Sequence, residues 1–168
     1  FGVGYDNVDV SACTEADVAL FISKGMVNYS VAEAVVTWML ALSHHLLTKD
    51  RLVRTGGWDE RNGYMGTELR DRTAGIIGAG GIGHTLAGLL GFFNMKEVLA
   101  YDPYIEPDRA SEIGVRLVDL ETLLRESDFV SVNCPLTEGT RGLLGREELA
   151  LMKPTAYLIN TSRGPVVQ

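Results

Sequence analysis

Apolar positions recur along this chain with two different periods, and each period predicts one kind of element. After residue 73, short apolar runs predict strands at Ala74–Ala79, Val98–Tyr101, Val115–Val118, Phe129–Asn133 and Ala156–Asn160. Between them, apolar residues at helical spacing predict helices at Gly81–Phe93, Pro107–Ile113, Leu120–Glu126 and Arg146–Met152. Strands that alternate with helices build a parallel sheet with right-handed crossovers. The predicted fold class is therefore α/β, a doubly wound parallel sheet with helices on both faces.

Before residue 73, one long helix dominates the pattern. It is predicted from Asn28 to about Arg54, because apolar residues recur at helical spacing at Val31, Val35, Trp38, Leu42 and Leu46. Ser30 and Glu33 have the spacing of a capping box at its start, and the glycine pair after Thr55 ends it.

Shorter elements flank this helix. A short helix is predicted at about Val8–Asp17 and a short strand at Val18–Ile22. The segment Trp58–Leu69 is polar but carries large aromatic residues, and we expect it to be an irregular arm.

The strand Ala74–Ala79 runs directly into the glycine pattern G-x-G-x-x-G, formed by Gly78, Gly80 and Gly83. In a dinucleotide-binding turn, the first glycine allows the tight turn, the second lets the backbone approach a pyrophosphate, and the third lets helix and strand pack closely. The next predicted strand ends on Asp102, which is close to the position of the acid that binds the ribose hydroxyls. The alternative is a glycine-rich turn without a ligand. The context favours a Rossmann fold that binds a dinucleotide.

Polar residues also follow the later predicted strands. In open parallel sheets, ligands bind outside the carboxyl ends of the strands. Cys134 and its neighbours follow one strand, and Thr161, Ser162 and Arg163 follow another. The planar fork of an arginine suits bidentate binding of a carboxylate, so Arg163 is a candidate ligand-binding residue rather than an ordinary surface arginine.

Composition narrows the class of protein. The net charge is −7 and no lysine or arginine cluster forms a basic patch, which argues against a nucleic-acid-binding surface. No apolar run approaches the length of about 18 residues that a membrane span needs, and no signal peptide begins the chain. Cys13 and Cys134 share no metal-binding or redox spacing and are expected as reduced thiols. We expect a cytoplasmic protein without a bound metal, and its ends read as those of a piece of a longer polypeptide.

Several motifs occur in a fixed order along the chain. They are Phe1–Asp9 (FGVGYDNVD), Ser30–Glu33 (SVAE), Gly78–Gly83, Tyr101–Pro103, Pro135–Thr137 and Asn160–Gly164 (NTSRG). Together they resemble the D-isomer-specific 2-hydroxyacid dehydrogenases, a family that includes phosphoglycerate dehydrogenase, D-lactate dehydrogenase and glyoxylate/hydroxypyruvate reductase. The resemblance covers essentially the whole chain and is more specific than the glycine motif alone.

The resemblance implies a domain organisation. Residues 1–27 would be the C-terminal part of a substrate domain, residues 28–55 the interdomain helix, and residues 72–168 a truncated NAD-binding Rossmann domain. Residues 56–71 resemble the arm that wraps a second subunit, which implies a homodimer.

The resemblance also implies roles for individual residues. Val3 and Gly4 would offer backbone N–H groups to the substrate's carboxylate, and Arg163 would bind that carboxylate and polarise the substrate's carbonyl. The residues implied in cofactor binding are Gly78, Gly80, Gly81, Ile82, Gly83, Asp102, Pro103, Cys134, Pro135, Thr140, Thr161 and Ser162. Asp102 would favour NAD over NADP, because a 2′-phosphate would face its negative charge.

The implied reaction is reversible hydride transfer between a nicotinamide and C2 of a D-2-hydroxy acid or 2-keto acid. A general base must take the hydroxyl proton, and in the family this is a histidine oriented by a glutamate, both downstream of the arginine motif. The chain ends five residues after Arg163, so we expect it to bind NAD without catalysing the reaction. His44, His45 and His84 are not candidates for this base.

Two other functions remain open. Family relatives include a corepressor that senses NAD on the same scaffold, and turnover of hydroxypyruvate or glyoxylate would separate that function from an enzyme. A methyltransferase that uses S-adenosylmethionine has a similar glycine loop and acid, although the motifs at Gly2–Asp9 and Asn160–Gly164 argue against it. The identity of the 2-hydroxy acid is not predicted.

Overall fold

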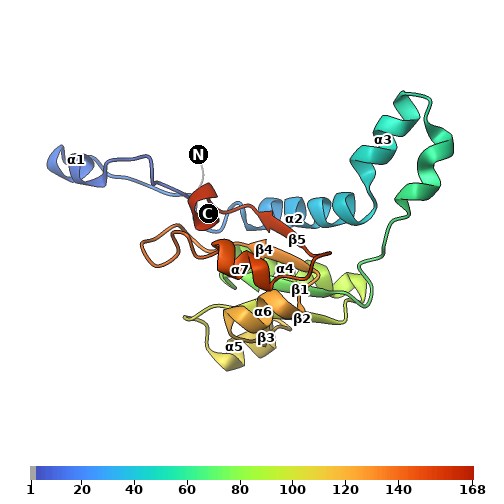
Figure 1. Cartoon of the computed structure of the whole chain (residues 1–168). Coiled ribbons are helices and arrows are strands. Elements are labelled where there is room, and N and C mark those ends of the chain that lie inside the picture. Colours follow the sequence, from blue (N-terminus) through green and yellow to red (C-terminus); the bar gives the residue numbers. More distant parts are fainter. Residues whose placement is uncertain (1–2) are drawn as a thin grey trace.

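The computed structural model describes residues 3–168, and Phe1 and Gly2 of the Phe1–Asp9 motif lie outside the described residues. At its centre is a parallel sheet with the strand order β3-β2-β1-β4-β5 (Figure 1). The strands are β1 (Thr73–Ile77), β2 (Glu97–Tyr101), β3 (Arg116–Leu117), β4 (Phe129–Val132) and β5 (Tyr157–Asn160). This order reverses direction between β1 and β4, as in a doubly wound sheet. The predicted fold class is confirmed.

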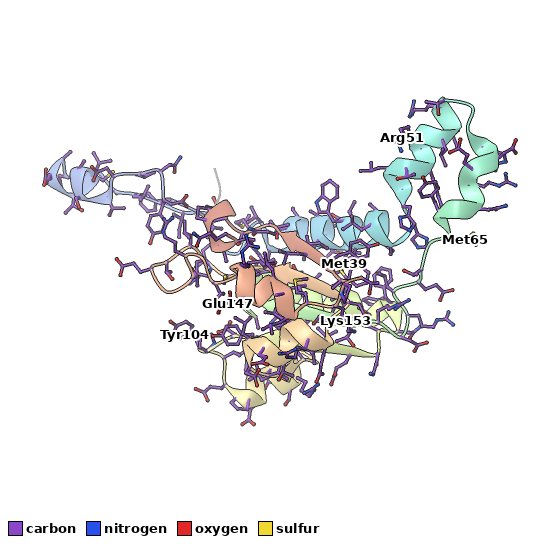
Figure 2. All side chains as sticks on the ribbon, in the orientation of Figure 1. Met39, Arg51, Met65, Tyr104, Glu147 and Lys153 are labelled. Atoms are coloured by element: carbon purple, nitrogen blue, oxygen red, sulfur yellow. The ribbon has the colours of Figure 1, made fainter. Side chains whose placement is uncertain are left out.

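Helices cover the two faces of the sheet. The helices are α1 (Val10–Glu15), α2 (Asn28–Ser43), α3 (Leu46–Arg54), α4 (Gly81–Leu90), α5 (Pro107–Glu112), α6 (Leu120–Glu126) and α7 (Arg146–Leu151), with 3-10 turns η1 (Trp58–Tyr64), η2 (Gly91–Phe93) and η3 (Gly164–Val166). The apolar faces of α2, α4 and α5 share one buried cluster, and those of α6 and α7 share the other. Figure 2 shows the Met39 side chain of α2 at this helix–sheet contact.

Strand β1 contributes to both clusters because successive side chains of a strand point to opposite faces. Ile76 packs in the α2–α4 cluster, whereas Ile77 packs in the α6–α7 cluster. All residues of β1 are buried, as expected for a strand covered on both faces. Helix α6 packs so closely on β1 that a Cβ added at Gly75 would lie 2.8 Å from Leu123 Cγ.

The strand register aligns the carboxyl ends of four strands. Ile77, the last residue of β1, pairs with Tyr101 of β2 and with Val132 of β4. Val132 in turn pairs with Asn160, the last residue of β5. The residues that follow these strands therefore lie along one edge of the sheet.

Three predictions for the first third of the chain are wrong, and two of them concern a short strand and a helix cap. Residues Val18–Ile22 form no strand, because they lie in a segment that projects away from the sheet and pairs with no other strand (Figure 1). Ser30 and Glu33 do not cap a helix start, because α2 already begins at Asn28, with Val27 as its N-cap and no side-chain cap hydrogen bond.

The long helix predicted over residues 28–54 is broken into α2 and α3. His45 lies in the left-handed region at φ 52°, and the two helices meet at a bend of 60°. The end of α2 frees the Ser43 carbonyl, which accepts a hydrogen bond of 2.9 Å from the Thr67 N–H. The arm thus returns onto the break, and a Cβ added at Gly66 would lie 2.9 Å from His44 Cα.

The predicted irregular arm is partly regular, since η1 covers its first half before the chain returns to the sheet. Within residues 3–168, no single helix is long and apolar enough to cross a membrane, although α2 and α3 pass the length and composition test as a bent pair. Cys13 and Cys134 are free thiols. The cytoplasmic location stays a prediction.

Candidate functional site

The glycine turn after β1 is formed by close backbone contacts. Gly78 has φ 91°, in the left-handed region that favours glycine. A Cβ added at Gly78 would lie 2.7 Å from the Cys134 backbone nitrogen. A Cβ at Gly83 would overlap the Gly78 carbonyl oxygen and lie 3.0 Å from Ile76 Cγ2. The first and third glycines of the pattern are therefore required by the turn and by the packing of α4 on β1.

The second glycine of the pattern faces open space. Gly80 is exposed, and a Cβ added there would meet no atom within 4 Å. Gly80 is also the N-cap of α4, and no side chain caps this helix end. The first N–H groups of α4 and the positive end of its dipole are thus accessible, which is the arrangement that binds phosphate groups. The bare backbone at Gly80 is a cradle that fits a pyrophosphate.

Asp102 lies directly beside this turn. Its Oδ2 accepts a hydrogen bond of 2.9 Å from the Ala79 N–H, and its Oδ1 accepts one of 2.9 Å from the Tyr104 N–H. A carboxylate has about four lone-pair sites, so Asp102 can still accept hydrogen bonds from two hydroxyl groups. The neighbouring Pro103 is exposed, and Tyr104 projects into solvent with 92% of its surface accessible (Figure 2).

The loop after β4 closes the other side of the glycine turn. Cys134 is buried against Gly78, and burial together with the charge of Asp102 raises the pKa of its thiol. The Thr140 hydroxyl donates a hydrogen bond of 2.6 Å to the Pro135 carbonyl and accepts one of 2.8 Å from the Thr137 N–H. Thr140 therefore braces the loop that exposes Pro135 at the site.

The turn after β5 is held by Asn160 and Asn133. Asn160 Oδ1 accepts hydrogen bonds from the Ser162 N–H and hydroxyl, and Asn160 Nδ2 donates one of 2.9 Å to the Arg163 carbonyl. The Thr161 hydroxyl lies 3.4 Å from Asn133 Oδ1, which links this turn to the end of β4. These contacts orient the segment that carries Arg163 along the same edge as the glycine turn.

Arg163 meets the start of the chain at this edge. Its Nε donates a hydrogen bond of 2.9 Å to Asp6 Oδ1, and its Nη2 lies against Gly4 so closely that a Cβ at Gly4 would overlap it. The structure thus brings together Gly4 and Arg163, to both of which the family resemblance gives a role in binding the substrate's carboxylate. Val3 is half-buried in the same segment.

Sequence reasoning missed three residues at this edge. Asp6 pairs with Arg163, Asn133 contacts Thr161, and the Asn28 side chain occupies the space where a Cβ at Gly81 would lie. Asp6 and Asn28 do stand in or beside quoted motifs, but no local spacing links either of them to a partner far away in the chain. Ile82, next to Gly81 in the first turn of α4, is half-buried.

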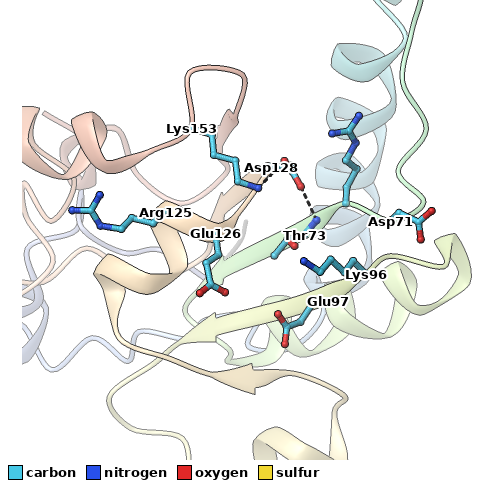
Figure 3. A pocket seen from close by; sticks show the side chains of 9 residues that line it. Asp71, Thr73, Lys96, Glu97, Arg125, Glu126, Asp128 and Lys153 are labelled. Carbon is cyan, nitrogen blue, oxygen red and sulfur yellow. Dashed lines mark hydrogen bonds and ion pairs between the residues drawn. The ribbon is translucent and has the colours of Figure 1, made fainter.

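A polar hollow of about 560 Å³ lies at the opposite edge of the sheet (Figure 3). It is lined by Asp71, Arg72, Thr73, Lys96, Glu97, Arg125, Glu126, Asp128 and Lys153. Lys153 Nζ pairs with Asp128 Oδ1 at 2.9 Å, and Asp128 Oδ2 accepts a hydrogen bond of 2.9 Å from the Thr73 N–H. The basic and acidic side chains that line the hollow are equal in number, so their formal charges cancel. The hollow lies at the amino ends of the strands. We assign it no role in the candidate site.

Known proteins resemble the chain over nearly its whole length. It is 41% identical over 166 residues to D-3-phosphoglycerate dehydrogenase of Archaeoglobus fulgidus, covering 99% of this chain and 31% of that protein. It is 39% identical over 173 residues to glyoxylate reductase of Thermococcus litoralis, covering 99% and 52%. The chain spans about a third to a half of the length of these relatives.

A solved structure supports the same relationship. The structure of D-lactate dehydrogenase from Aquifex aeolicus, complexed with NAD and lactic acid, superposes with a TM-score of 0.88 at 33% identity and covers 99% of this chain and 50% of that one. None of these three relatives gives support to a corepressor-like function.

The sequence profile described as D-isomer specific 2-hydroxyacid dehydrogenase, NAD binding domain, matches residues 36–168. This match covers most of the chain, including the glycine turn, Asp102 and the Arg163 turn. The chain belongs to the D-isomer-specific 2-hydroxyacid dehydrogenase family and contains its NAD-binding domain.

Proposed function

We propose that this chain is the NAD-binding part of an oxidoreductase that transfers hydride between a nicotinamide and C2 of a D-2-hydroxy acid or 2-keto acid. The observation that carries the proposal is the common edge of the sheet. The aligned ends of β1, β2 and β5 place the glycine turn, Asp102 and Arg163 on one side of the molecule. A nucleotide and an anionic substrate could therefore reach one another there.

The residues at this edge suit the proposed cofactor. The bare backbone at Gly80 and the free start of α4 would hold the pyrophosphate, with Gly81 and Ile82 in the first turn. Asp102 would accept hydrogen bonds from the adenosine ribose, and Pro103, Cys134, Pro135 and Thr140 line the neighbouring loops. Thr161 and Ser162 would lie beside the nicotinamide. When bound, the nicotinamide supplies a hydride acceptor or donor.

Arg163 would bind the substrate's carboxylate, and the N–H groups of the Val3–Gly4 segment would assist it. The guanidinium retains unused N–H donors for this purpose. All three histidines precede Arg163 in the chain, on or near α2 and α4. We propose that these 168 residues bind NADH but do not reduce a 2-keto acid, because among the described residues no histidine contacts Arg163 to act as a general base.

We also propose the domain boundaries that the family resemblance implies, with residues 1–27 as the tail of a substrate domain, residues 28–55 as the interdomain segment and residues 72–168 as the NAD-binding domain. Residues 56–71 would be a dimer arm. The arm and α3 support this with exposed apolar side chains at Leu47, Val53, Trp58 and Met65, and with an apolar groove between α3 and η1.

The first experiment compares the affinities of NADH and NADPH for the 168-residue chain by isothermal titration calorimetry. Asp102 should give NADH the higher affinity, because its negative charge repels a 2′-phosphate. In Asp102→Asn the preference should fall roughly tenfold, which corresponds to about 1.4 kcal/mol. Asn keeps one acceptor for the Ala79 N–H, whereas Asp102→Ala leaves that buried donor unpaired.

A second variant tests the cradle. Gly80→Ala places a methyl group where no protein atom lies within 4 Å, so the fold should tolerate it while NADH affinity falls. Equal NADH affinity in Gly80→Ala and the unchanged chain would contradict the placement of the pyrophosphate. Absence of binding for both nucleotides by the unchanged chain would contradict the proposal for these residues.

A further inference from the structure

Two nitrogens of the Arg163 guanidinium donate hydrogen bonds within the chain, and the third lies close to Gly4. Nε donates a hydrogen bond of 2.9 Å to Asp6 Oδ1, and Nη1 donates one of 2.9 Å to the Ser162 carbonyl. Nη2 lies against the backbone of Gly4. Two of these contacts come from a segment more than 150 residues away in the sequence, so the orientation of the guanidinium depends on how residues 4–6 meet the turn after β5.

The two hydrogen bonds leave donors free for a ligand. A guanidinium carries five N–H groups, and Asp6 and Ser162 each take one of them. The remaining three are on Nη1 and Nη2. With Nε bound to Asp6, these are the groups that a substrate's carboxylate would meet.

The ion pair itself does little to stabilise the fold. Both side chains are partly exposed, at 38% for Arg163 and 51% for Asp6, and ion pairs at such positions contribute little to stability. Their effect on orientation is different, because an arginine side chain otherwise samples many rotamers and loses that freedom when it binds a ligand. A partner that already holds the guanidinium in place reduces this loss.

We propose that Asp6 is a positioning residue, which fixes Nε of Arg163 so that its Nη1 and Nη2 groups face the carboxylate of the substrate. This inference rests on the proposed function, in which Arg163 binds that carboxylate. Asp6 acts through Arg163 and does not contact the substrate. The hydrogen bond from Arg163 also lowers the pKa of the Asp6 carboxyl, so Asp6 is ionised at neutral pH.

A different role for Asp6, competition with the substrate for Arg163, predicts the opposite change in affinity. If Asp6 competed with the substrate's carboxylate for Arg163, its removal would free the guanidinium and raise the affinity for an anion. If Asp6 positions Arg163, its removal lowers that affinity. Asn at this position separates the two roles further, because its Oδ1 can still accept the Nε–H hydrogen bond although the charge is gone.

The experiment uses Asp6→Ala, Asp6→Asn and the control Asp17→Asn in the 168-residue chain. Asp17 lies in the same segment, is exposed, and has φ 53°, a conformation that asparagine tolerates. The first readout is the ¹⁵N–¹H resonance of Arg163 Nε, assigned by its loss in Arg163→Lys. The second is the affinity for oxamate, a 2-keto acid analogue, in the presence of saturating NADH.

We expect slow solvent exchange of the Arg163 Nε–H in the unchanged chain, in Asp6→Asn and in Asp17→Asn, and fast exchange in Asp6→Ala. Oxamate affinity should fall roughly tenfold in Asp6→Ala, because the Arg163 side chain then has to be ordered in the binding step itself. It should be restored in Asp6→Asn. NADH affinity should be equal in all variants.

Two results would overturn the inference. One is an Nε–H exchange rate that is the same in Asp6→Ala and the unchanged chain, and the other is tighter oxamate binding by Asp6→Ala. Failure of the proposed function gives a different result, namely loss of NADH binding by the unchanged chain. The Nε–H comparison needs neither ligand, so it tests the positioning of Arg163 in that case too.

Discussion

Replacing Gly83 by alanine tests whether α4 packs on β1 as closely as the structure shows. The added Cβ would overlap the Gly78 carbonyl oxygen and would lie 3.2 Å from its carbonyl carbon and 3.0 Å from Ile76 Cγ2. Two of these atoms belong to the backbone of the glycine turn, which cannot rotate away as a flexible side chain can. Helix α4 would therefore have to move away from β1.

The expected loss of stability is the difference between two opposing effects. Overpacking of this kind costs typically about 1–3 kcal/mol. Alanine in a helix is favoured over glycine by about 1 kcal/mol, which offsets part of that loss. We expect Gly83→Ala to lower the free energy of unfolding by up to about 2 kcal/mol.

Gly88 offers a matched control in the same helix. It is exposed, and a Cβ added there would meet no atom within 4 Å. Gly88→Ala should therefore raise the free energy of unfolding by roughly 0.5–1 kcal/mol, the ordinary gain for this exchange in a helix. The same substitution in one helix thus has opposite signs at two positions, so the two variants differ by about 2 kcal/mol.

Urea unfolding followed by circular dichroism measures this difference. At a slope of about 2 kcal/mol/M, the two midpoints should lie about 1 M apart, with Gly83→Ala the lower. NADH affinity should also fall in Gly83→Ala and remain unchanged in Gly88→Ala. A Gly83→Ala midpoint equal to or above that of Gly88→Ala would refute the close approach of α4 to the glycine turn.

Three further predictions concern the core, the polar hollow at the amino ends of the strands and the arm. Among residues 3–168 the buried Ser127 hydroxyl has no hydrogen-bond partner, so Ser127→Ala should leave stability unchanged or raise it by up to about 1 kcal/mol in urea unfolding; a clear loss would reveal a partner. Burial alone would raise the pKa of the Asp128 carboxyl, but its contacts with the Thr73 N–H and Lys153 lower that pKa overall. The ionised carboxylate therefore stabilises the fold at pH values above its ordinary pKa of about 3.9, and this stabilisation is lost as the pH falls through the lowered pKa. Asp128→Asn should therefore flatten the fall of the urea midpoint below about pH 4, and an unchanged pH profile would argue against the Lys153 pair. Trp58→Glu on the arm should shift the chain toward monomer in analytical ultracentrifugation, whereas Phe92→Glu, also highly exposed but outside the arm, should not; equal behaviour of the two would contradict an arm-mediated dimer.

Much of the fold could be predicted because its elements have local causes. The apolar runs at β1, β2, β4 and β5 and the helical spacing of α4 to α7 predict elements whose ends lie within three residues of those observed. The predicted strand Val18–Ile22 fails for the opposite reason. An apolar run becomes a strand only where another strand pairs with it, and this condition is not local.

The break between α2 and α3 also could not be predicted from the local spacing of apolar residues. The apolar spacing continues through residues 43–46, yet His45 adopts φ 52° and the chain bends. The freed Ser43 carbonyl accepts a hydrogen bond from Thr67, more than 20 residues later. The spacing of apolar residues indicates which face of a helix is buried. It does not indicate that a later segment of the chain will contact the end of that helix.

The candidate site divides in the same way. Gly78, Gly80, Gly83 and Asp102 can be recognised in the sequence because each supplies a backbone conformation or a charge at a fixed spacing within one β-α-β unit. The ion pair between Asp6 and Arg163 has no such spacing, and neither has the contact of Asn28 with Gly81. The path of residues 4–6 decides the first contact and the packing of α2 against α4 decides the second, because only the folded chain brings together groups that are so far apart along it.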